Sequence, residues 1–362
     1  MEDSLMFDRM TIQSRLKNYD VSFVGDAATH MAEYLDKVSS ILIFDSYVFD
    51  LYKDSFAPLL SKYRFIKIDC SEGTKTMDYS QQVIRELLKL NVRTNDMLVA
   101  IGGGITQDIV AFISSIIFRG VKWIFYPTTL LAQADSCIGS KSSINFDSYK
   151  NLIGTFTPPD NIFISFRFLE TLSESDIRSG IGEMLHYFLN DGIEDATELM
   201  AQYQTLLINR NALSPFIKKS LSIKRKIIEV DEFDTKIRHI FNYGHTFGHA
   251  IEAISNYAIP HGQAITVGMD LANHLSLNRN MIDQSCFNEM HELLIINMPS
   301  FWIDENNIEE YCQALSKDKK NIGNKLGCIL TRGAGKMEKC FLDIDDHFRN
   351  ELLNYFIQYH QS

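Results

Sequence analysis

Leu98-Val-Ala-Ile-Gly-Gly-Gly-Ile-Thr-Gln-Asp108 is the stretch that decides the fold of this 362-residue chain. A short apolar run leads into three glycines, and a helical pattern follows directly. Glycines let the backbone approach a pyrophosphate closely, and the start of a helix offers free N–H groups and a positive dipole end. The order of strand, glycine turn and helix therefore indicates a nucleotide-binding α/β domain. The spacing is not Gly-x-Gly-x-x-Gly, so the turn alone is a weak signal.

The same alternation of elements extends on both sides of this turn. Between the β-rich runs lie amphipathic stretches at 78–90 and 105–118, which predicts parallel strands joined by helices. Beyond about residue 170 long helical patterns replace the strand signals. We therefore expect an α/β domain at 1–170 and a helical domain at 171–362. The β-rich runs are 21–24, 41–44, 65–68, 97–101, 123–126 and 162–164.

Composition excludes several classes of function. The formal net charge is −11 and there is no block of Lys and Arg, which argues against a nucleic-acid partner. The six cysteines show no Cys-x-x-Cys pairing, which is typical of reduced thiols in a cytoplasmic protein. No apolar run reaches the length of a membrane span, and the acidic amino terminus has no signal-peptide core. We expect a cytoplasmic protein with a small-molecule ligand and no membrane partner.

Three histidines, His245, His249 and His261, fall within 17 residues. If the segment after Gly244 is helical, positions 245 and 249 share a face, with Cβ atoms about 5–6 Å apart. Pro260 is expected to end that helix, and His261 can then return to the same place. A catalytic zinc site uses about three such ligands and keeps one position open. The alternative is a set of ordinary core or surface histidines.

Glu183 lies in the otherwise apolar, helix-like run Ser179-Gly-Ile-Gly-Glu-Met-Leu-His-Tyr187. A buried carboxylate without a partner is costly, so a metal ion or a basic group beside it is the natural explanation. The alternative is that Glu183 lies on an exposed helix face.

Asp45 follows the 41–44 run, where an acidic residue can bind the ribose of adenosine. Its alternative role is to cap a helix or form a turn.

The polar, Gly/Ser-rich segment 127–154 predicts a loop that wraps a small polar ligand. Lys141, Lys150 and Asn151 in this segment are candidates to hold phosphate or hydroxyl oxygens. Lys224 and Arg238 bracket the acidic run 229–234. Taken singly, each of these basic residues is better explained as a solvated charge.

Between about residues 40 and 335, these motifs together resemble the 3-dehydroquinate synthases and the wider sugar phosphate cyclases. The resemblance is specific because separate motifs follow one another in the family's order and spacing. The matching motifs are Glu72-Gly-Thr-Lys75, Gly102-Gly-Gly104 with Asp108, Phe118-Arg-Gly120, Pro127-Thr-Thr-Leu-Leu131, Asp135-Ser136, Lys141, Lys150-Asn151, Gly154, Glu183, Lys224, Arg238, Asn242, the three histidines and Asp318-Lys-Lys320.

The resemblance implies a Rossmann-like NAD-binding domain at 1–170 followed by an all-helical metal- and substrate-binding domain at 171–362. It also implies a role for each group of residues. The implied metal ligands are Glu183, His245 and His261, with zinc or cobalt as the metal. The implied catalytic residues are His249, Asp135, Lys141 and His186. The implied substrate-binding residues are Arg119, Lys150, Asn151, Lys224, Arg238 and Asn242. The implied NAD-binding residues are Asp45, Glu72, Lys75, Gly102, Gly103, Gly104, Asp108, Thr128 and Thr129.

The family's chemistry would oxidise a ring hydroxyl of a seven-carbon sugar acid phosphate transiently, eliminate phosphate, return the hydride and close a carbocycle. The resemblance thus implies a lyase, 3-dehydroquinate synthase of the shikimate pathway, acting on 3-deoxy-D-arabino-heptulosonate 7-phosphate as a homodimer. In the dimer, Arg119 would reach the neighbouring subunit's site. The alternatives are a specialised cyclase, such as an aminodehydroquinate synthase or a sedoheptulose 7-phosphate cyclase, an NAD- and metal-dependent polyol dehydrogenase, or a non-enzymatic relative.

Four positions depart from the family's pattern. His186 stands where the family usually has an active-site lysine, and an imidazole cannot replace a permanent cation beside an anionic substrate. Gln107 and Ser140 stand in place of glycines, and Gln263 stands in place of the Glu in His-Gly-Glu. These changes either reshape the pocket for another substrate or are ordinary drift.

Overall fold

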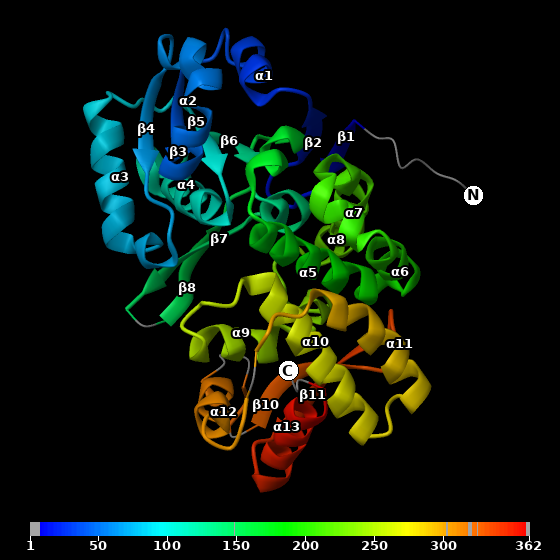
Figure 1. The fold of residues 1–362 in the computed structure, drawn as a ribbon. Coiled ribbons are helices and arrows are strands. Elements are labelled where there is room, and N and C mark those ends of the chain that lie inside the picture. The colour runs from blue at the N-terminus through cyan, green and yellow to red at the C-terminus, as the bar shows by residue number, and fades with distance from the viewer. Residues whose placement is uncertain (1–7, 148, 302, 318–320, 324, 360–362) are drawn as a thin grey trace. The chain divides into compact units, whose positions relative to one another are not determined.

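The computed structural model describes residues 8–147, 149–301, 303–317, 321–323 and 325–359 (Figure 1). The chain forms two compact units. The first comprises the chain up to Leu172 together with Arg210–Phe233, and the second comprises Ser173–Asn209 and the chain from Asp234 onward. The predicted boundary near residue 170 thus lies close to Leu172, where the first range of the first unit ends. The grouping of 210–233 with the first unit differs from the predicted two-part division.

The first unit is built on a seven-stranded sheet in the order β1-β2-β9-β6-β5-β3-β4. Only β1 is antiparallel to its neighbour, β2. The six predicted β-rich runs all lie in this sheet, which confirms them, whereas β1 was not predicted. The strands are β1 (Arg9–Ile12), β2 (Tyr19–Val24), β3 (Ser40–Asp45), β4 (Arg64–Ile68), β5 (Met97–Gly102), β6 (Lys122–Pro127) and β9 (Asn161–Ser165).

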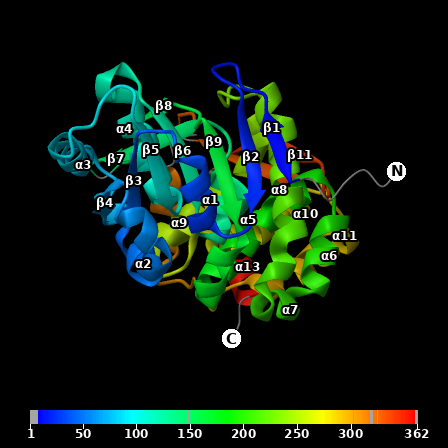
Figure 2. The same cartoon turned by 90° about the horizontal axis from the view of Figure 1, so that it is seen from above.

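Helices cover both faces of this sheet, as a parallel sheet requires. In Figure 2, α1 and α2 lie on one side of the strands and α4 lies on the other. The strands β3 and β5 are buried along almost their whole length, which explains why their sequences are nearly continuous apolar runs. The helices of the first unit are α1 (Ala27–Tyr34), α2 (Ser46–Leu60), α3 (Met77–Lys89), α4 (Gly104–Ile116) and α8 (Ser214–Val230), with short helical turns η1 (Glu72–Thr74), η2 (Ile117–Arg119), η3 (Ala132–Ser136), η4 (Phe166–Thr171) and η5 (Arg210–Leu213).

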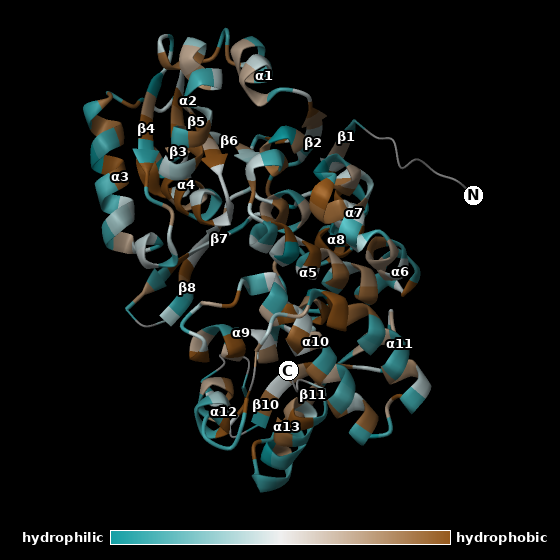
Figure 3. Ribbon diagram, viewed as in Figure 1, coloured by the Kyte–Doolittle hydropathy of each residue, from teal (hydrophilic) through white to brown (hydrophobic). Residues whose placement is uncertain are grey.

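The helix α3 is the predicted amphipathic stretch 78–90, and α4 is the predicted stretch 105–118. Figure 3 shows hydrophobic and hydrophilic residues together along α3, as expected of a helix that buries one face. Val83 and Leu87, one turn apart, form part of the buried face of α3.

A hairpin replaces the predicted loop at 127–154. Its strands, β7 (Lys141–Phe146) and β8 (Tyr149–Phe156), pair antiparallel with an irregularity between Ile144 and Phe146. The prediction of a continuous loop was therefore wrong. Isolated Gly and Ser residues mark turns, but they do not reveal that the intervening residues pair with each other.

The second unit is helical apart from one hairpin, and this confirms the predicted fold class. The prediction of an all-helical domain did not include the hairpin β10–β11. The elements are α5 (Glu174–Asp191), α6 (Glu194–Ala201), α7 (Tyr203–Ile208), η6 (Ile237–Asn242), α9 (His245–Ile254), α10 (His261–Asn278), α11 (Gln284–Leu294), η7 (Ile295–Asn297), α12 (Ile308–Ser316), β10 (Lys325–Thr331), β11 (Met337–Asp343) and α13 (Asp346–Tyr359).

The helix α10 is the centre of the second unit, because every residue from Gly262 to Ser276 is buried. Two backbone contacts set its position. A Cβ atom at Gly262 would lie 1.8 Å from the carbonyl oxygen of Ser179 in α5, and one at Gly268 would lie 2.1 Å from that of Gly244 before α9. Only glycine permits such approaches, so α5 and α9 both contact the backbone of α10 directly.

No helix in the described ranges combines the length and apolarity needed to cross a membrane. The six cysteines are all free thiols.

A buried carboxylate in α10 joins three helices of the second unit. Asp270 is fully buried, and its Oδ2 accepts hydrogen bonds from His291 Nδ1 of α11 and from the Tyr355 hydroxyl of α13, each at 2.8 Å. Burial opposes the charge on His291, but the hydrogen bond and the negative charge of Asp270 outweigh it, so the pKa of His291 is raised. A histidine with a raised pKa stabilises the fold fully below its usual pKa, and this contribution is lost as the pH rises through the folded value.

We predict that His291→Gln lowers the free energy of unfolding by about 3 kcal/mol near pH 5.5, because Asp270 is then left buried beside a single donor. The difference should shrink at about pH 8.5, because His291 of the parent protein loses its proton as the pH rises through its raised pKa. Urea denaturation at both pH values measures the effect. His347→Gln, at an exposed position, is the matched control. A stability difference that is equal at both pH values would contradict the charged pair.

Candidate active site

The helix α9 begins at His245 and presents His245 and His249 on one face. Their ring centroids are 5.4 Å apart, which confirms that the two positions share a helix face. Gly244 before them has φ +77°, a conformation that an L side chain rarely adopts. This residue turns the chain into α9 against α10.

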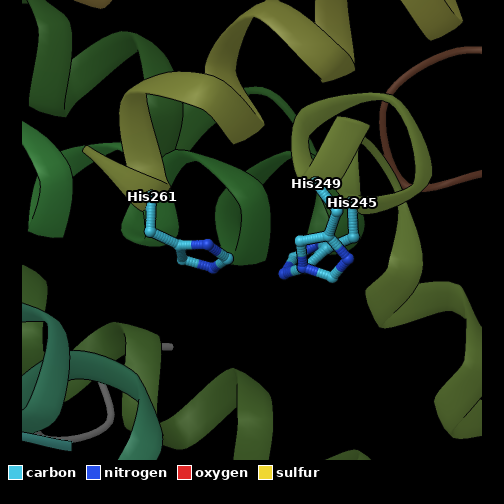
Figure 4. Close-up of side chains that lie close together, drawn as sticks. All are labelled: His245, His249 and His261. Atoms are coloured by element: carbon cyan, nitrogen blue, oxygen red, sulfur yellow. The ribbon is translucent and has the colours of Figure 1, made fainter. Parts of the chain in front are cut away.

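His261 is the first residue of the next helix, α10. Pro260 precedes it as the N-cap residue, whereas α9 has already ended at Ile254. The prediction that Pro260 ends the first helix was therefore wrong: its fixed φ and missing N–H suit the start of a helix equally well. The prediction that His261 lies close to the other two histidines is confirmed, since its ring centroid lies 5.6 Å from those of His245 and His249. Figure 4 shows the His261 ring pointing towards the other two.

The three imidazoles offer ligand atoms that all lie within 4.8 Å of one another. His249 is the exposed member of this group, and the other two are partly buried. Exposure makes His249 accessible to a substrate, and it therefore supports the predicted proton-transfer role for this residue.

Glu183 in α5 lies beside the same group and is 1% exposed. The alternative of an exposed helix face was wrong. Its Oε1 lies 3.0 Å from His261 Nε2 and 3.6 Å from His245 Nε2. Two ligands of a tetrahedral zinc ion, each about 2.0–2.1 Å from the metal, are about 3.4 Å apart, so these distances suit a shared metal ion. None of the described residues donates a well-aligned hydrogen bond to Oε1.

Hydrogen-bond acceptors orient the two partly buried histidines, His245 and His261. His261 Nδ1 lies 3.1 Å from Glu252 Oε2, and His245 Nδ1 lies 3.2 Å from the carbonyl oxygen of Tyr243. Each contact turns the Nε2 atom of its ring towards Glu183, as carboxylates and carbonyls commonly do for metal-binding histidines. Burial opposes the charge on His261, but Glu252 and Glu183 outweigh it and raise its pKa well above the usual value. The site therefore favours positive charge, which a divalent ion would supply.

Glu252 was not among the predicted residues. Its signal in the sequence is an acidic residue three positions after His249 in the same helix. Spacing alone does not show that this side chain reaches His261.

His186 is fully buried in α5, one turn after Glu183. Its Nδ1 lies 3.9 Å from Glu183 Oε2, and its ring centroid lies 4.8 Å from that of His245. The ring packs against Tyr187 and Phe241. His186 therefore lies beside the metal-ligand candidates.

Three of the predicted nucleotide-binding residues, Asp45, Gly102 and Thr128, lie together at the carboxyl ends of strands in the first unit. The pairing of Gly102 with Pro127 aligns the carboxyl ends of β5 and β6, and Thr128 N donates to Gly102 O at 2.9 Å. A Cβ at Gly102 would lie 2.0 Å from Thr106 Oγ1 and 3.0 Å from the Cβ of Asp45. Asp45 thus lies beside the glycine turn.

Asp45 also caps α2, because Tyr47 N donates to its Oδ1 at 2.9 Å. The capping role that the sequence left open is therefore present. Burial raises the pKa of Asp45, although hydrogen bonds from the backbone oppose this effect.

A second group of predicted residues forms one network around Lys75 in the first unit. Lys75 Nζ donates to Asp108 Oδ2 at 2.9 Å and to Asn151 Oδ1 at 2.6 Å. Lys150 Nζ lies 3.7 Å from Glu72 Oε1. Burial raises the pKa of Asp108, although the charge of Lys75 opposes this rise. The structure thus brings these five residues together.

Two predicted site residues with different implied roles, Asp135 and Lys224, are also in contact. Lys224 Nζ donates to Asp135 Oδ1 at 2.7 Å and to its carbonyl oxygen at 2.8 Å.

Lys141 is exposed at the start of β7, and Thr129 Oγ1 accepts from Ala132 N. Arg119 is exposed on a turn where its φ is +67°.

The predicted substrate-binding residues are divided between the units. Arg238 is buried in η6 of the second unit, where Asn242 also lies and donates to His239 O at 3.0 Å. The other four belong to the first unit. That all six bind one substrate stays a prediction. The motif Asp318-Lys-Lys320 lies outside the described residues.

Two departures from the family's pattern make internal contacts. Gln107 Nε2 donates to Ser136 O at 2.7 Å, and its Oε1 accepts from Ser136 Oγ at 2.8 Å. Gln263 Nε2 donates to Asn297 O at 3.2 Å. Both glutamines are therefore integrated into the packing of their own unit.

We predict that Glu183→Gln, His245→Ala and His261→Ala each lose most of a bound divalent metal after dialysis, while His249→Ala retains it. Removing one ligand of a zinc site deprives the ion of a strong bond and weakens its retention. Elemental analysis of the purified variants measures this. Loss of metal from the His249 variant with full retention in the Glu183 variant would replace Glu183 by His249 in the ligand set.

The sequence matches family models over most of its length. Residues 65–179 match the 3-dehydroquinate synthase N-terminal model, and residues 180–321 match the 3-dehydroquinate synthase C-terminal model. The chain is 37% identical over 341 residues to the 3-dehydroquinate synthase of Dictyoglomus thermophilum, covering 91% of this chain and 94% of the relative.

Solved structures of cyclases share the fold. A 2-deoxy-scyllo-inosose synthase complexed with carbaglucose-6-phosphate, NAD+ and Co2+ matches with a TM-score of 0.85 and 25% identity, covering 96% of this chain and 99% of that one. ValA, a 2-epi-5-epi-valiolone synthase from Streptomyces hygroscopicus subsp. jinggangensis 5008 with NAD+ and Zn2+ bound, matches with a TM-score of 0.81 and 24% identity, covering 94% and 98%. On the evidence of the family models and the curated relative, this chain belongs to the 3-dehydroquinate synthase family.

Proposed function

We propose that the protein is a phosphate-eliminating cyclase that converts 3-deoxy-D-arabino-heptulosonate 7-phosphate into 3-dehydroquinate, with NAD+ and a divalent metal, zinc or cobalt, as cofactors. The observation that carries this proposal is the convergence of Glu183, His245 and His261 in a member of the 3-dehydroquinate synthase family. The NAD+ and Co2+ in the solved 2-deoxy-scyllo-inosose synthase complex support the choice of cofactors.

The residues of the second unit have distinct tasks in this proposal. Glu183, His245 and His261 hold the metal, and His249 moves protons to and from the substrate from its exposed position. Arg238 and Asn242 bind substrate oxygens. When bound, the metal polarises the oxygen of the hydroxyl that is oxidised, and NAD+ accepts the hydride.

The residues of the first unit bind the nucleotide and the charged substrate groups. The turn Gly102–Gly104 and Thr128 hold the pyrophosphate, with Asp45 on the ribose. Lys141 and Lys150 hold phosphate oxygens by charge-assisted hydrogen bonds. Because the chain carries a net charge of −11, such local cations are needed to retain an anionic substrate.

A specialised cyclase is the second candidate, and the buried His186 favours it. A fixed cation is expected beside an anionic ring substituent, and an imidazole fully enclosed between Glu183 and aromatic rings does not supply one. A polyol dehydrogenase, the third candidate, would release NADH in net turnover, whereas a cyclase returns the hydride.

We also propose a homodimer in which the exposed Arg119 reaches the neighbouring subunit's site. The cytoplasmic location stays a prediction from the cysteine pattern.

The identity of the carbocycle tests the proposed function. Purified protein with NAD+ and zinc is incubated with a panel of heptulose phosphates. We expect 3-dehydroquinate and free phosphate from the heptulosonate phosphate, without net NADH. Net NADH formation without phosphate release would contradict a cyclase of either kind.

We predict that Gly103→Val weakens NAD+ binding about tenfold or more, equal to about 1.4 kcal/mol. A Cβ at position 103 would lie only 3.1 Å from Thr129 Cγ2, and the larger side chain would fill space that the pyrophosphate needs. Calorimetric titration with NAD+ measures the effect. Gly25→Val is the matched control, because its Cβ would meet no atom within 4 Å. Equal NAD+ affinity in the Gly103 variant and the parent would argue against this position.

We predict that His186→Lys raises turnover of the heptulosonate phosphate at about pH 8, because a lysine is a permanent cation whereas imidazoles in general titrate near neutral pH. His186→Gln is the control for simple loss of the ring. Product formation is measured by chromatography. No gain in the lysine variant, together with turnover by the parent protein of a heptulose phosphate that lacks the carboxylate, would favour the specialised cyclase.

A further inference from the structure

The turn before Lys141 has an unusual backbone. Ser140 has φ +56° and Gly139 has φ +119°. The positive φ at Ser140 is strained for a residue with a Cβ atom, and such strain persists only where surrounding contacts hold it. Three contacts hold this turn. The Tyr19 hydroxyl accepts from Gly139 N at 2.9 Å, and Thr157 N donates to Ser140 O at 2.7 Å. In the third contact, Ser140 Oγ donates to the carboxylate of Glu232.

That carboxylate belongs to Glu232, which is 5% exposed. Its Oε1 accepts from Ser140 Oγ at 2.8 Å and from Ser14 Oγ at 2.8 Å, and its Oε2 accepts from Arg15 N at 2.8 Å. One buried carboxylate thus joins the loop between β1 and β2 to the start of β7. Hydrogen bonds to a carboxylate are about twice as strong as those between neutral groups, so they stabilise the contact between the β1–β2 loop and the start of β7.

The helix α8 ends just before Glu232. It contacts residues that precede Ser140 in the chain. Ser220 Oγ donates to Ala134 O at 2.8 Å, and Lys224 Nζ binds Asp135 at 2.7 Å. The segment 210–233 therefore contacts residues 134–140 at three successive points. Lys141 is the next residue, and it is exposed at the first position of β7.

We propose that Glu232 is a positioning residue that acts through Ser140 to fix Lys141 where it binds the phosphate of the substrate. This inference rests on the proposed function, in which Lys141 holds phosphate oxygens. Gly139 and Ser140 set the direction in which β7 begins, and hence the direction of the Lys141 side chain. A misplacement of about 1 Å in a substrate-binding group can cost up to about 100-fold in catalytic efficiency.

Glu232→Gln tests the proposal, because the amide keeps the shape but removes the negative charge that strengthens the hydrogen bonds with Ser140 Oγ and Arg15 N. We expect KM for the sugar phosphate to rise about tenfold, with kcat changed less than about twofold. Metal content and NAD+ affinity should stay at parent values. The dissociation constant of inorganic phosphate, measured by calorimetry, should rise by a similar factor, which makes the test independent of turnover.

The decisive comparison uses Lys141→Ala alone and combined with Glu232→Gln. If Glu232 acts through Lys141, the double variant has the same KM and phosphate affinity as Lys141→Ala alone. A further loss in the double variant would overturn the proposal, and so would an unchanged phosphate affinity in Lys141→Ala. The kinetic comparison uses whichever sugar phosphate the parent protein turns over, so a different substrate would overturn the proposed function without affecting this inference.

Two variants of Ser140 separate positioning from stability. Ser140→Ala and Ser140→Gly both remove the hydroxyl, but glycine also relieves the strain of the positive φ. We expect both to share the rise in KM, with Ser140→Gly the more stable of the two in urea denaturation. A KM that follows the stability of the variants, rising only in Ser140→Ala, would show a merely structural role and overturn the proposal. These variants also keep the test valid if Glu232→Gln fails to fold.

Discussion

The direct contact of three helix backbones in the second unit is the constraint on which the candidate metal site depends. At Gly262 and Gly268 the backbone of α10 meets carbonyl oxygens of Ser179 and Gly244 so closely that no Cβ atom fits. Because α5, α9 and α10 approach to this degree, a short glutamate side chain on α5 reaches histidines at the first turns of both other helices. Larger residues at these points would separate the helices, and the donor atoms would no longer lie within a metal's bonding distance.

The electrostatics of the site follow from the same packing. A carboxylate that is 1% exposed needs a positive partner, and burial alone would leave it costly. Glu252 adds a second negative charge behind His261, so the local environment favours a cation. The first unit uses the opposite arrangement, since Lys75 and Lys224 are buried cations, each held by an aspartate. Both units thus hold their charged groups in fixed positions before any ligand binds, which lowers the cost of reorganisation on binding.

The segment 210–233 shows how sequence order and spatial grouping differ in this chain. It follows three helices of the second unit in the sequence but packs with the first unit, where α8 contacts the segment that carries Asp135. Its last residues lead back into the second unit and the histidine-bearing helix. A single stretch of chain therefore supports residues of the first unit and then continues directly to the metal-ligand candidates.

The sequence by itself determined those features that arise from local pattern. Continuous apolar runs specified the six main strands, and the spacing of His245 and His249 specified a shared helix face, because both follow from the fixed periods of strands and helices. Motifs in the family's order also identified the family. The tertiary structure alone decided the hairpin β7–β8 and the burial of His186 against Glu183. It also decided the contacts of Glu252 and Glu232 and the grouping of 210–233 with the first unit. These features depend on contacts between residues far apart in the chain, for which the local sequence carries no periodic signal.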